Sequence, residues 1–282
     1  MNETNFCIVG LGLIGGSYAQ ALSKAGKRVT AIDINADSIR YAQENGSIAC
    51  GADKDFAPLL READAVVFAL YPHTFVEFVR EWQSALKPGA LITDVSGVKA
   101  GVVQPVQAFL REDVEFIACH PMAGREVSGV QYANAAIFEN ANFIITPTEK
   151  NTPRGIGFAK ALAAVLGFAR VSVLSCEEHD EMIGYVSQLT HAIAVSLMNA
   201  SDNAHLAQYT GDSFRDLTRI ARINEVMWSE LFLMNRDNLT EEIDRFCDAM
   251  QTLKACLAAG DEAALQQLFI TSSKRRAAFD DK

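Results

Sequence analysis

One histidine, His120, lies at the end of an apolar run of the sequence, and Pro121 and Gly124 shape the turn that follows it. A histidine in this setting either caps a strand by hydrogen bonding or performs chemistry. A neutral imidazole can accept a proton from an alcohol while a hydride leaves the same carbon. Because α/β proteins bind ligands at the carboxyl ends of their parallel strands, we interpret His120 as a candidate catalytic base.

Two further polar residues have both a functional and a structural interpretation. Ser96 follows another apolar run, in the segment Asp94-Val-Ser-Gly-Val-Lys99, so it could reach the space beside His120 or simply cap the next helix. One of the arginines Arg215, Arg219 and Arg222 could bind a substrate carboxylate through its planar guanidinium, or Arg219 could pair with Asp216 as part of the scaffold. The residue types alone leave these alternatives open.

The segment from Met182 to Ser201 contains no charged residue and is long enough to span a bilayer. Its many hydroxyl and amide side chains argue against lipid, so we predict the central helix of a second, all-helical domain. Ser187 and His191 lie one turn apart on an apolar face, where a buried histidine is more often a core residue than a ligand. Such thorough burial indicates packing against a second copy of the chain, as a homodimer. A further apolar stripe is formed by Met182, Val186, Leu189, Ile193 and Leu197.

The turn Gly10-Leu-Gly-Leu-Ile-Gly15 follows an apolar run and precedes a helical pattern, which is the context of a dinucleotide-binding turn. Its glycines permit the tight turn, the approach of a pyrophosphate and the packing of helix on strand. Asp33 directly follows the second apolar run, at a position where a carboxylate can accept hydrogen bonds from both ribose hydroxyls. No Arg or Lys follows it directly, which favours NAD over NADP, and FAD stays open as an alternative. The predicted cofactor-binding residues are Gly10, Gly12, Leu13, Ile14, Gly15 and Asp33.

The elements that must position these residues follow from the hydrophobic pattern. Short apolar runs without alternation predict parallel strands covered on both faces, with helices between them, whereas only helical stretches follow Cys176. We therefore predict an α/β fold, with a doubly wound Rossmann-type NAD-binding domain over residues 1–174 and an all-α dimerisation and substrate domain over residues 175–282. The predicted strands are Phe6–Val9, Val29–Ile32, Ala65–Leu70, Leu91–Thr93, Phe116–Cys119, Phe143–Thr146 and Val171–Val173. The predicted helical stretches include residues 17–25, 36–44, 178–203, 215–235, 240–258 and 261–279.

The composition excludes several classes of function. A chain of 282 residues, 49% of them hydrophobic, predicts two domains with a sizeable core. The formal net charge of −10 argues against nucleic acid and anionic membranes as partners, so an anionic substrate must meet local positive groups. The six cysteines are scattered without a C-x-x-C pair, and the N-terminus has no signal-peptide pattern. These features predict a cytoplasmic protein with reduced cysteines and no metal site.

Several motifs occur in a fixed order along nearly the whole chain. After the glycine turn come D-x-S-G-x-K at 94–99, H-P-M-A-G at 120–124, S-x-L-x-H at 187–191, F-R-D-L-T-R-I-A at 214–221 and W-S-E-L-F-L-M-N at 228–235. In this combination the sequence resembles the prephenate dehydrogenase family, which also includes arogenate and cyclohexadienyl dehydrogenases. The later motifs are much more specific than the glycine turn.

The resemblance implies NAD-dependent oxidative decarboxylation of prephenate to 4-hydroxyphenylpyruvate, on the route to tyrosine. Hydride leaves the carbon that bears the ring hydroxyl while His120 accepts the hydroxyl proton, and loss of CO2 then makes the ring aromatic. By the same resemblance Ser96 is assigned to catalysis and Arg219 to a substrate carboxylate. His191 and Ser187 are assigned to the side-chain end of the substrate.

Three positions depart from the common pattern of that family. Ser96-Gly97 inverts the usual D-x-G-S-x-K order, which leaves the contact of the serine with the substrate hydroxyl open. Arg125 replaces a small hydroxylated residue and either adds positive charge near the site or faces solvent, which we favour. Gln188 stands where the family commonly has histidine, and we predict that it binds substrate. Prephenate and arogenate differ only in a keto or amino group, so both stay open, and the retained cationic set favours prephenate.

Two other classes of protein share part of the pattern. A β-hydroxyacid dehydrogenase or imine reductase has a similar glycine turn and helical dimer domain, but it usually relies on a lysine that is absent between Glu178 and Asn203. A nucleotide sensor without enzymatic activity would need a DNA-binding or partner surface, and no basic recognition helix is evident. Because the chain ends soon after the last predicted helix, we expect no tyrosine inhibition through a separate regulatory domain.

Overall fold

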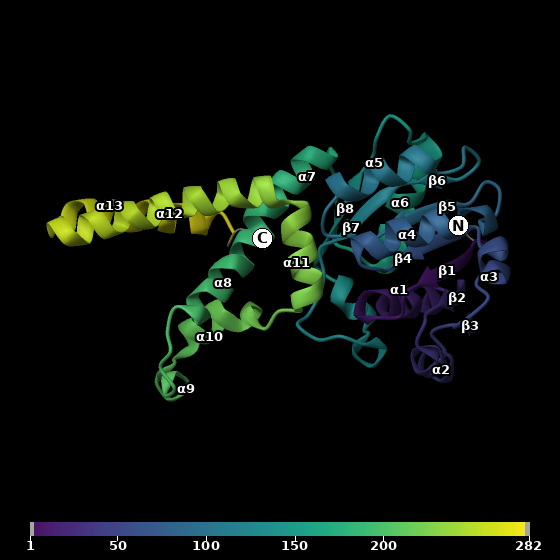
Figure 1. Ribbon diagram of the computed structural model, residues 1–282, viewed down its shortest axis with the longest axis horizontal. Helices are drawn as coiled ribbons and strands as arrows, with labels where there is room; N and C mark the ends of the chain where they lie inside the picture. The colour runs from purple at the N-terminus through teal and green to yellow at the C-terminus, as the bar shows by residue number, and fades with distance from the viewer. Residues whose placement is uncertain (1–2, 280–282) are drawn as a thin grey trace. The chain divides into compact units, whose positions relative to one another are not determined.

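The structure, a computed structural model, describes residues 3–279 and contains two compact units, Met1–Asn235 and Arg236–Lys282 (Figure 1). The first unit begins with a six-stranded parallel sheet in the order β3-β2-β1-β4-β5-β6. The strand order reverses between β1 and β4, which is the switch point of a doubly wound sheet. The predicted Rossmann-type fold is confirmed, and β3 is a short additional strand. The strands are β1 (Asn5–Val9), β2 (Arg28–Ile32), β3 (Cys50–Ala52), β4 (Ala65–Phe68), β5 (Leu91–Asp94) and β6 (Glu115–Phe116).

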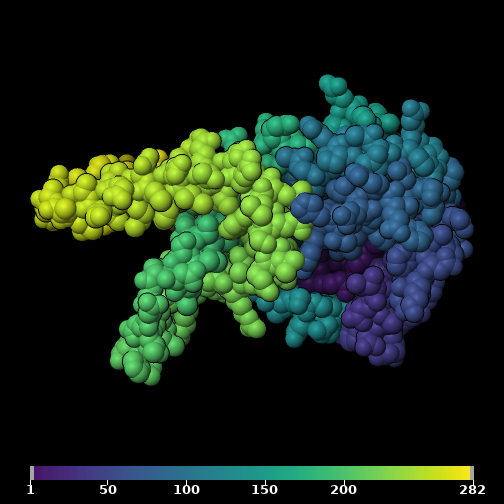
Figure 2. All heavy atoms as spheres, viewed as in Figure 1, coloured from purple at the N-terminus to yellow at the C-terminus, as the bar shows by residue number. Residues whose placement is uncertain are grey.

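Helices cover both faces of this sheet. Alternate residues of β1 enter two separate cores, with Ile8 in one and Val9 in the other. The N-terminal strand and helix, purple in Figure 2, are accordingly seen only in a narrow gap between later segments. α1 (Leu13–Lys24) begins directly after the glycine turn, earlier than predicted, and α2 (Ala36–Glu44) has its predicted bounds. The other helices here are α3 (Ala57–Glu62), α4 (Pro72–Trp82), η1 (Gln83–Ala85), α5 (Ala100–Phe109) and α6 (Pro153–Leu166).

A second, three-stranded sheet corrects the prediction of one wholly parallel sheet. The predicted strand Phe116–Cys119 splits at Ile117, whose N–H still donates to the Ile92 carbonyl on β5 over 3.0 Å. Beyond it, β7 pairs antiparallel with β8, and β8 pairs parallel with β9. The expected cover on both faces is also wrong for β9, because this outer strand exposes Val171 and Val173. The strands are β7 (Ala118–Pro121), β8 (Asn142–Thr146) and β9 (Arg170–Val173), and the 3-10 turns η2 (Val130–Tyr132) and η3 (Ala135–Phe138) lie between β7 and β8.

The charge-free segment forms a helix interrupted by a π-helical turn. α7 (Cys176–Ile183) starts at a capping box made by Ser175 and Glu178, and η4 (Gly184–Leu189) is the π segment that leads into α8 (Thr190–Asn199). A π turn holds more residues than an α turn and therefore changes which residues share a face. On the single chain Val186 of the predicted apolar stripe is 48% exposed, whereas Leu189 is buried.

Short helices complete the first unit. They are α9 (Leu206–Tyr209), α10 (Asp212–Thr218), η5 (Arg219–Ala221) and α11 (Glu225–Met234). Asn224 caps α11, because its side-chain oxygen accepts the N–H of Met227 over 2.9 Å. Within residues 3–279, no helix combines the length and apolar character that crossing a membrane requires.

The second unit is a pair of helices, α12 (Arg236–Ala259) and α13 (Glu262–Ala277), that pack against each other. The connection between them uses Gly260 in a left-handed conformation, with φ of +65°, and Asp261 then caps α13 through the N–H of Ala264. Both helices agree with the predicted helical stretches. The predicted domain boundary at residue 174 stays a prediction.

Candidate functional site

The glycine turn is closely packed at Gly10 and Gly15 and has free space at Gly12. Gly10 has φ of +95°, and a Cβ there would lie 2.5 Å from the Ala69 carbonyl oxygen. A Cβ on Gly15 would lie 1.8 Å from the carbonyl oxygen of Gly10, so neither position accepts a side chain. A Cβ on Gly12, in contrast, would meet nothing within 4 Å. This free space at the N-terminus of α1 is the cradle that a pyrophosphate needs. Leu13 and Ile14 supply the first helical residues beside it.

The carboxylate of Asp33 is anchored beside this turn. It accepts the N–H of Leu11 over 2.6 Å and the N–H of Asn35 over 2.8 Å. A carboxylate held at this place still has lone pairs for a ribose diol. The turn, the helix N-terminus and Asp33 therefore fit a dinucleotide without further change.

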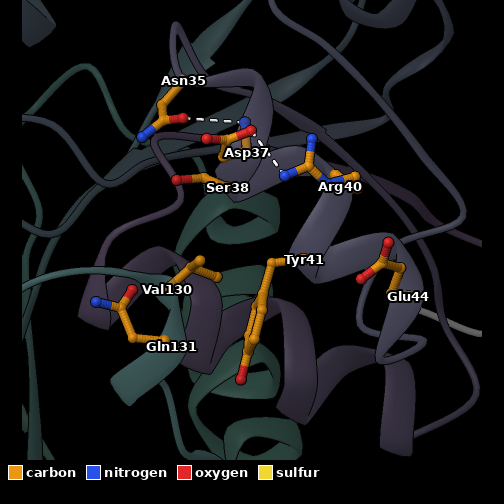
Figure 3. Close-up of a pocket in the computed structure, with 8 residues that line it drawn as sticks. All are labelled: Asn35, Asp37, Ser38, Arg40, Tyr41, Glu44, Val130 and Gln131. Atoms are coloured by element: carbon orange, nitrogen blue, oxygen red, sulfur yellow. Dashed lines mark hydrogen bonds and ion pairs between the residues drawn. The ribbon is translucent and has the colours of Figure 1, made fainter.

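A pocket of about 290 Å³ lies beyond Asp33, between α2 and η2 (Figure 3). Its one basic side chain, Arg40, is paired with Asp37 over 2.8 Å, as the dashed line in Figure 3 shows. Two carboxylates, Asp37 and Glu44, line the pocket against this one arginine, which disfavours the additional phosphate of NADP. The residues that line the pocket are Asn35, Asp37, Ser38, Arg40, Tyr41, Glu44, Val130 and Gln131.

A fully buried ion pair holds the strand that carries the candidate base. The Lys99 ammonium lies 2.8 Å from an oxygen of Asp94, and neither side chain is exposed. Lys99 also donates to the Cys119 carbonyl over 2.7 Å, while Asp94 accepts the Cys119 N–H over 2.9 Å. The pair thus fixes the backbone of Cys119, on β7, to the end of β5. His120, the residue after Cys119, is therefore held next to the carboxyl end of β5.

His120 contacts a second histidine, His179 on α7. The two atoms His120 Nδ1 and His179 Nε2 are 2.8 Å apart, and His179 Nδ1 lies 2.7 Å from Asp180 Oδ1. A carboxylate only accepts, so His179 carries its proton on Nδ1 and accepts at Nε2. His120 must then donate from Nδ1, which leaves its Nε2 as a lone-pair acceptor. This is the tautomer that a base needs.

The surroundings keep both imidazoles neutral. Burial lowers the pKa of His120 well below its ordinary value, and the neighbouring His179 and the Lys99 ammonium add to this shift. Burial also lowers the pKa of His179, although its hydrogen bond to Asp180 opposes the shift. His120 therefore stays unprotonated, and able to accept a proton, at neutral pH.

The Nε2 atom of His120 faces the backbone of Gly97. A Cβ added to Gly97 would lie 3.8 Å from that nitrogen and 3.7 Å from the Leu231 side chain. Ser96 does not contact His120: its N–H donates to Asp94 over 3.1 Å, and its buried hydroxyl has no partner within residues 3–279. The inverted Ser-Gly order therefore places the glycine, not the serine, beside the base.

A second cluster surrounds His191. Its Nδ1 donates to the carbonyl oxygen of Ser187 over 2.9 Å, and its ring stacks on Trp228 with 3.7 Å between centroids. The predicted Ser187–His191 pair is thus made through the backbone and not through the serine hydroxyl. Burial lowers the pKa of His191, and the opposite charges of Glu126 and Arg219 also act on it.

Arg219, the predicted carboxylate ligand, is 64% exposed in its side chain and pairs with Glu126. Glu126 lies in the loop that follows β7, the strand that carries His120, so this ion pair connects that loop to η5. The structural alternative, a pair with Asp216, is not what Arg219 forms here. Arg125, which precedes Glu126, is exposed, as we favoured.

Gln188 is buried, and both ends of its amide are occupied. Its Nε2 donates to the Leu231 carbonyl over 3.0 Å, and its Oε1 accepts from Asn235 over 2.8 Å. Asn235 donates in turn to the carbonyl of Asp180 over 2.9 Å. Gln188 therefore aligns α11 with α7, and the predicted contact of Gln188 with substrate stays a prediction.

Three residues of the site were missed by the sequence analysis: His179, Asp180 and Glu126. Nothing local in the sequence connects His179 to His120, which lies 59 residues away. The adjacent His-Asp pair at the start of a helix was the only available signal. A carboxylate that accepts a hydrogen bond from one histidine nitrogen fixes the tautomer, but only the fold reveals which group the other nitrogen faces.

Comparison with known proteins gives the family. One family model, the prephenate dehydrogenase nucleotide-binding domain, matches residues 18–171, and a second, the prephenate dehydrogenase dimerization domain, matches residues 175–271. The prephenate dehydrogenase of Bacillus subtilis is 31% identical over 276 residues, which cover 95% of this chain and 74% of that protein. The cyclohexadienyl dehydrogenase of Zymomonas mobilis is 27% identical, over 97% of this chain and 95% of that protein.

A solved structure agrees over the whole chain. The crystal structure of prephenate dehydrogenase from Aquifex aeolicus, in complex with hydroxyphenyl propionate and NAD+, has a TM-score of 0.91 and 30% identity, and the match covers 99% of each chain. The enzyme class and the cofactor agree with the sequence analysis: the chain is a dehydrogenase, and its cofactor is NAD. By its sequence motifs, its fold and these matches, the chain belongs to the prephenate dehydrogenase family.

Proposed function

We propose that this protein oxidises and decarboxylates prephenate with NAD, forming 4-hydroxyphenylpyruvate for tyrosine biosynthesis. The observation that carries the proposal is the position of His120 Nε2. This acceptor atom faces Gly97, while Nδ1 of the same ring is hydrogen-bonded to His179. A base in this tautomer can take the proton of a ring hydroxyl. The family membership supplies the substrate class.

The residues perform this reaction mainly by positioning. NAD, when bound at the glycine turn, accepts the hydride. His120 accepts the hydroxyl proton at Nε2 as the carbon–oxygen bond becomes a carbonyl. That carbonyl is conjugated through the ring with the carbon that bears the carboxylate, so the carbon–carbon bond to CO2 breaks and its electron pair completes the aromatic ring. The ring oxygen then takes the proton back from His120 and becomes the phenol of the product. The neighbouring Lys99 and Asp94 form an ion pair with each other, so His120 is the group that accepts the proton.

Arg219 is the proposed ligand of a substrate carboxylate. A guanidinium can hold a carboxylate by two parallel hydrogen bonds. In the structure the Arg219 guanidinium pairs with the carboxylate of Glu126. Substrate binding therefore replaces the Glu126 carboxylate by a substrate carboxylate, with little change in charge around Arg219. His191 and Ser187 are the proposed contacts for the side-chain end of the substrate. We propose Ser96 as a neighbour of the reacting hydroxyl rather than as a partner of His120.

Arogenate is a second candidate substrate, and one observation favours it. Because His191 donates from Nδ1 to the Ser187 carbonyl, its Nε2 is an acceptor when the ring is neutral. An acceptor suits the ammonium group of arogenate better than the keto group of prephenate. Arg219 provides the complementary carboxylate site in either case.

The test is NADH formation by the purified protein with NAD and either substrate, followed by absorbance. Turnover of prephenate with 4-hydroxyphenylpyruvate as product supports the first proposal. Turnover of arogenate alone, with tyrosine as product, replaces the substrate and keeps the chemistry. No turnover of either, with intact NAD binding, contradicts both.

We further propose a homodimer formed by a helical domain over residues 175–282, with the NAD-binding domain over residues 1–174. The match to a dimerization domain supports this, as do exposed apolar side chains on that part of the chain, among them Tyr185, Val186 and Leu217. Light scattering on the purified protein measures the mass directly. A monomer at micromolar concentration contradicts the proposal.

A further inference from the structure

Two histidines and a carboxylate form a line that ends in the interior of the protein. The rings of His120 and His179 meet edge to face, with 5.1 Å between centroids, and His179 and Asp180 are buried. His120 is half-buried, whereas His179 and Asp180 are buried, so protons enter the line at His120. The charged groups that act on the inner members are Lys99, Asp94 and Asp180.

A proton that stays on His120 is poorly placed. It creates an imidazolium in a desolvated site near the Lys99 ammonium. The carboxylate of Asp94 is already matched by that ammonium, at 2.8 Å. Asp180 differs, because it is held by the backbone N–H groups of Lys99 and Ala100 at 2.8 and 2.7 Å, in addition to His179. A positive charge is therefore better placed on His179, in direct contact with Asp180, than on His120.

We propose that His179 is a positioning residue that also receives the proton charge during turnover. The proposal rests on the proposed function for its timing. The substrate hydroxyl proton binds His120 Nε2, and the proton on His120 Nδ1 moves to His179 Nε2. His120 ends neutral in the opposite tautomer, and His179 ends as an imidazolium against Asp180. One proton enters and one shifts, no electrons move in this step, and the proton returns by the reverse path to the ring oxygen when loss of CO2 makes that oxygen a phenolate.

Nitrogen NMR of the histidine-labelled protein tests the arrangement without any substrate. At neutral pH both rings are expected to carry hydrogen on Nδ1. On acidification, the first proton taken up by the pair is expected to make His179 the imidazolium, while His120 stays neutral and moves its hydrogen to Nε2. An imidazolium at His120 in that first step, or a resting His120 with hydrogen on Nε2, overturns the proposal. Since this readout needs no turnover, it stands apart from failure of the proposed function.

Kinetics of His179→Gln separate proton transfer from simple orientation. The glutamine oxygen can accept the hydrogen bond from His120 Nδ1 but cannot take its proton. We expect kcat to fall about 10- to 100-fold, with the KM for substrate and the Kd of NAD within twofold of the unmodified protein. His205→Gln, an exchange of the same type at an exposed position, is the matched control and should keep full activity. An unchanged kcat in His179→Gln overturns the proposal.

Discussion

The cofactor-binding region runs from Gly10 to Asp33 and presents mostly backbone atoms, whereas the region around His120 presents side chains from distant segments. In the first, two glycines leave no room for a Cβ, and the N–H of Leu11 holds Asp33. In the second, His120 depends on a contact with His179, 59 residues away.

This difference separates two kinds of sensitivity. The cofactor turn is specified by local backbone conformation, so a single methyl group disturbs it. The catalytic region is specified by hydrogen bonds between buried side chains, whose loss leaves charged or polar groups without partners. Changes in the first region should therefore act on NAD binding and on stability, and changes in the second on turnover or substrate affinity.

The largest effect is expected from His120→Asn, which removes the proton acceptor. We expect kcat to fall about 10²- to 10⁴-fold, because general-base catalysis contributes a factor of this size. NAD affinity, measured by fluorescence titration, should be unchanged, because no atom of the glycine turn is altered. A similar loss of NAD binding would show that the two regions are not separable.

Gly15→Ala should combine lost NAD binding with lost stability. The added Cβ would lie 1.8 Å from the Gly10 carbonyl, and we expect a cost of about 1–3 kcal/mol in the free energy of unfolding. Gly12→Ala is the matched control, because its Cβ has free space and should weaken NAD binding alone. Denaturant unfolding without cofactor distinguishes the two variants. Equal stability of both would contradict the packing argument.

Arg219→Ala should mainly weaken substrate binding. We expect KM for the substrate to rise about 10- to 100-fold, which corresponds to one charge-assisted hydrogen-bonded pair, with the Kd of NAD unchanged. Arg215→Ala, which removes an exposed arginine 3.7 Å from Asp212, is the control and should leave KM unaltered. Steady-state kinetics with the preferred substrate provide the measurement, and an unchanged KM would remove Arg219 from the site.

The pH dependence should show the smallest effect. Burial lowers the pKa of His120, so the base stays neutral, and active, as the pH falls below the ordinary imidazole value of about 6.5. The acid limb of kcat/KM is therefore expected below that value, with activity lost only at still lower pH. A profile of kcat/KM against pH checks this, and an acid limb above 6.5 would mean that the base is solvated.

Sequence patterns anticipated those parts of the molecule that depend on short segments. α2 has its predicted bounds because Asn35 caps it locally, and the glycine turn was identified from residues within one strand and one helix. Errors arose where distant contacts decide. The π turn at Gly184–Leu189 interrupts the predicted continuous helix, and β7 left the main sheet to pair with β8.

The sequence by itself determined the fold class, the cofactor turn and the identity of His120 as a candidate base, because these rest on local conformation and on the order of the motifs. Only the tertiary structure decided which groups face that base. It brought His179 and Asp180 to one side of His120 and Gly97 to the other, and it turned Gln188 toward Leu231 and Asn235. Hydrogen-bond partners across the fold depend on how helices pack on strands, and no spacing along the chain specifies that packing.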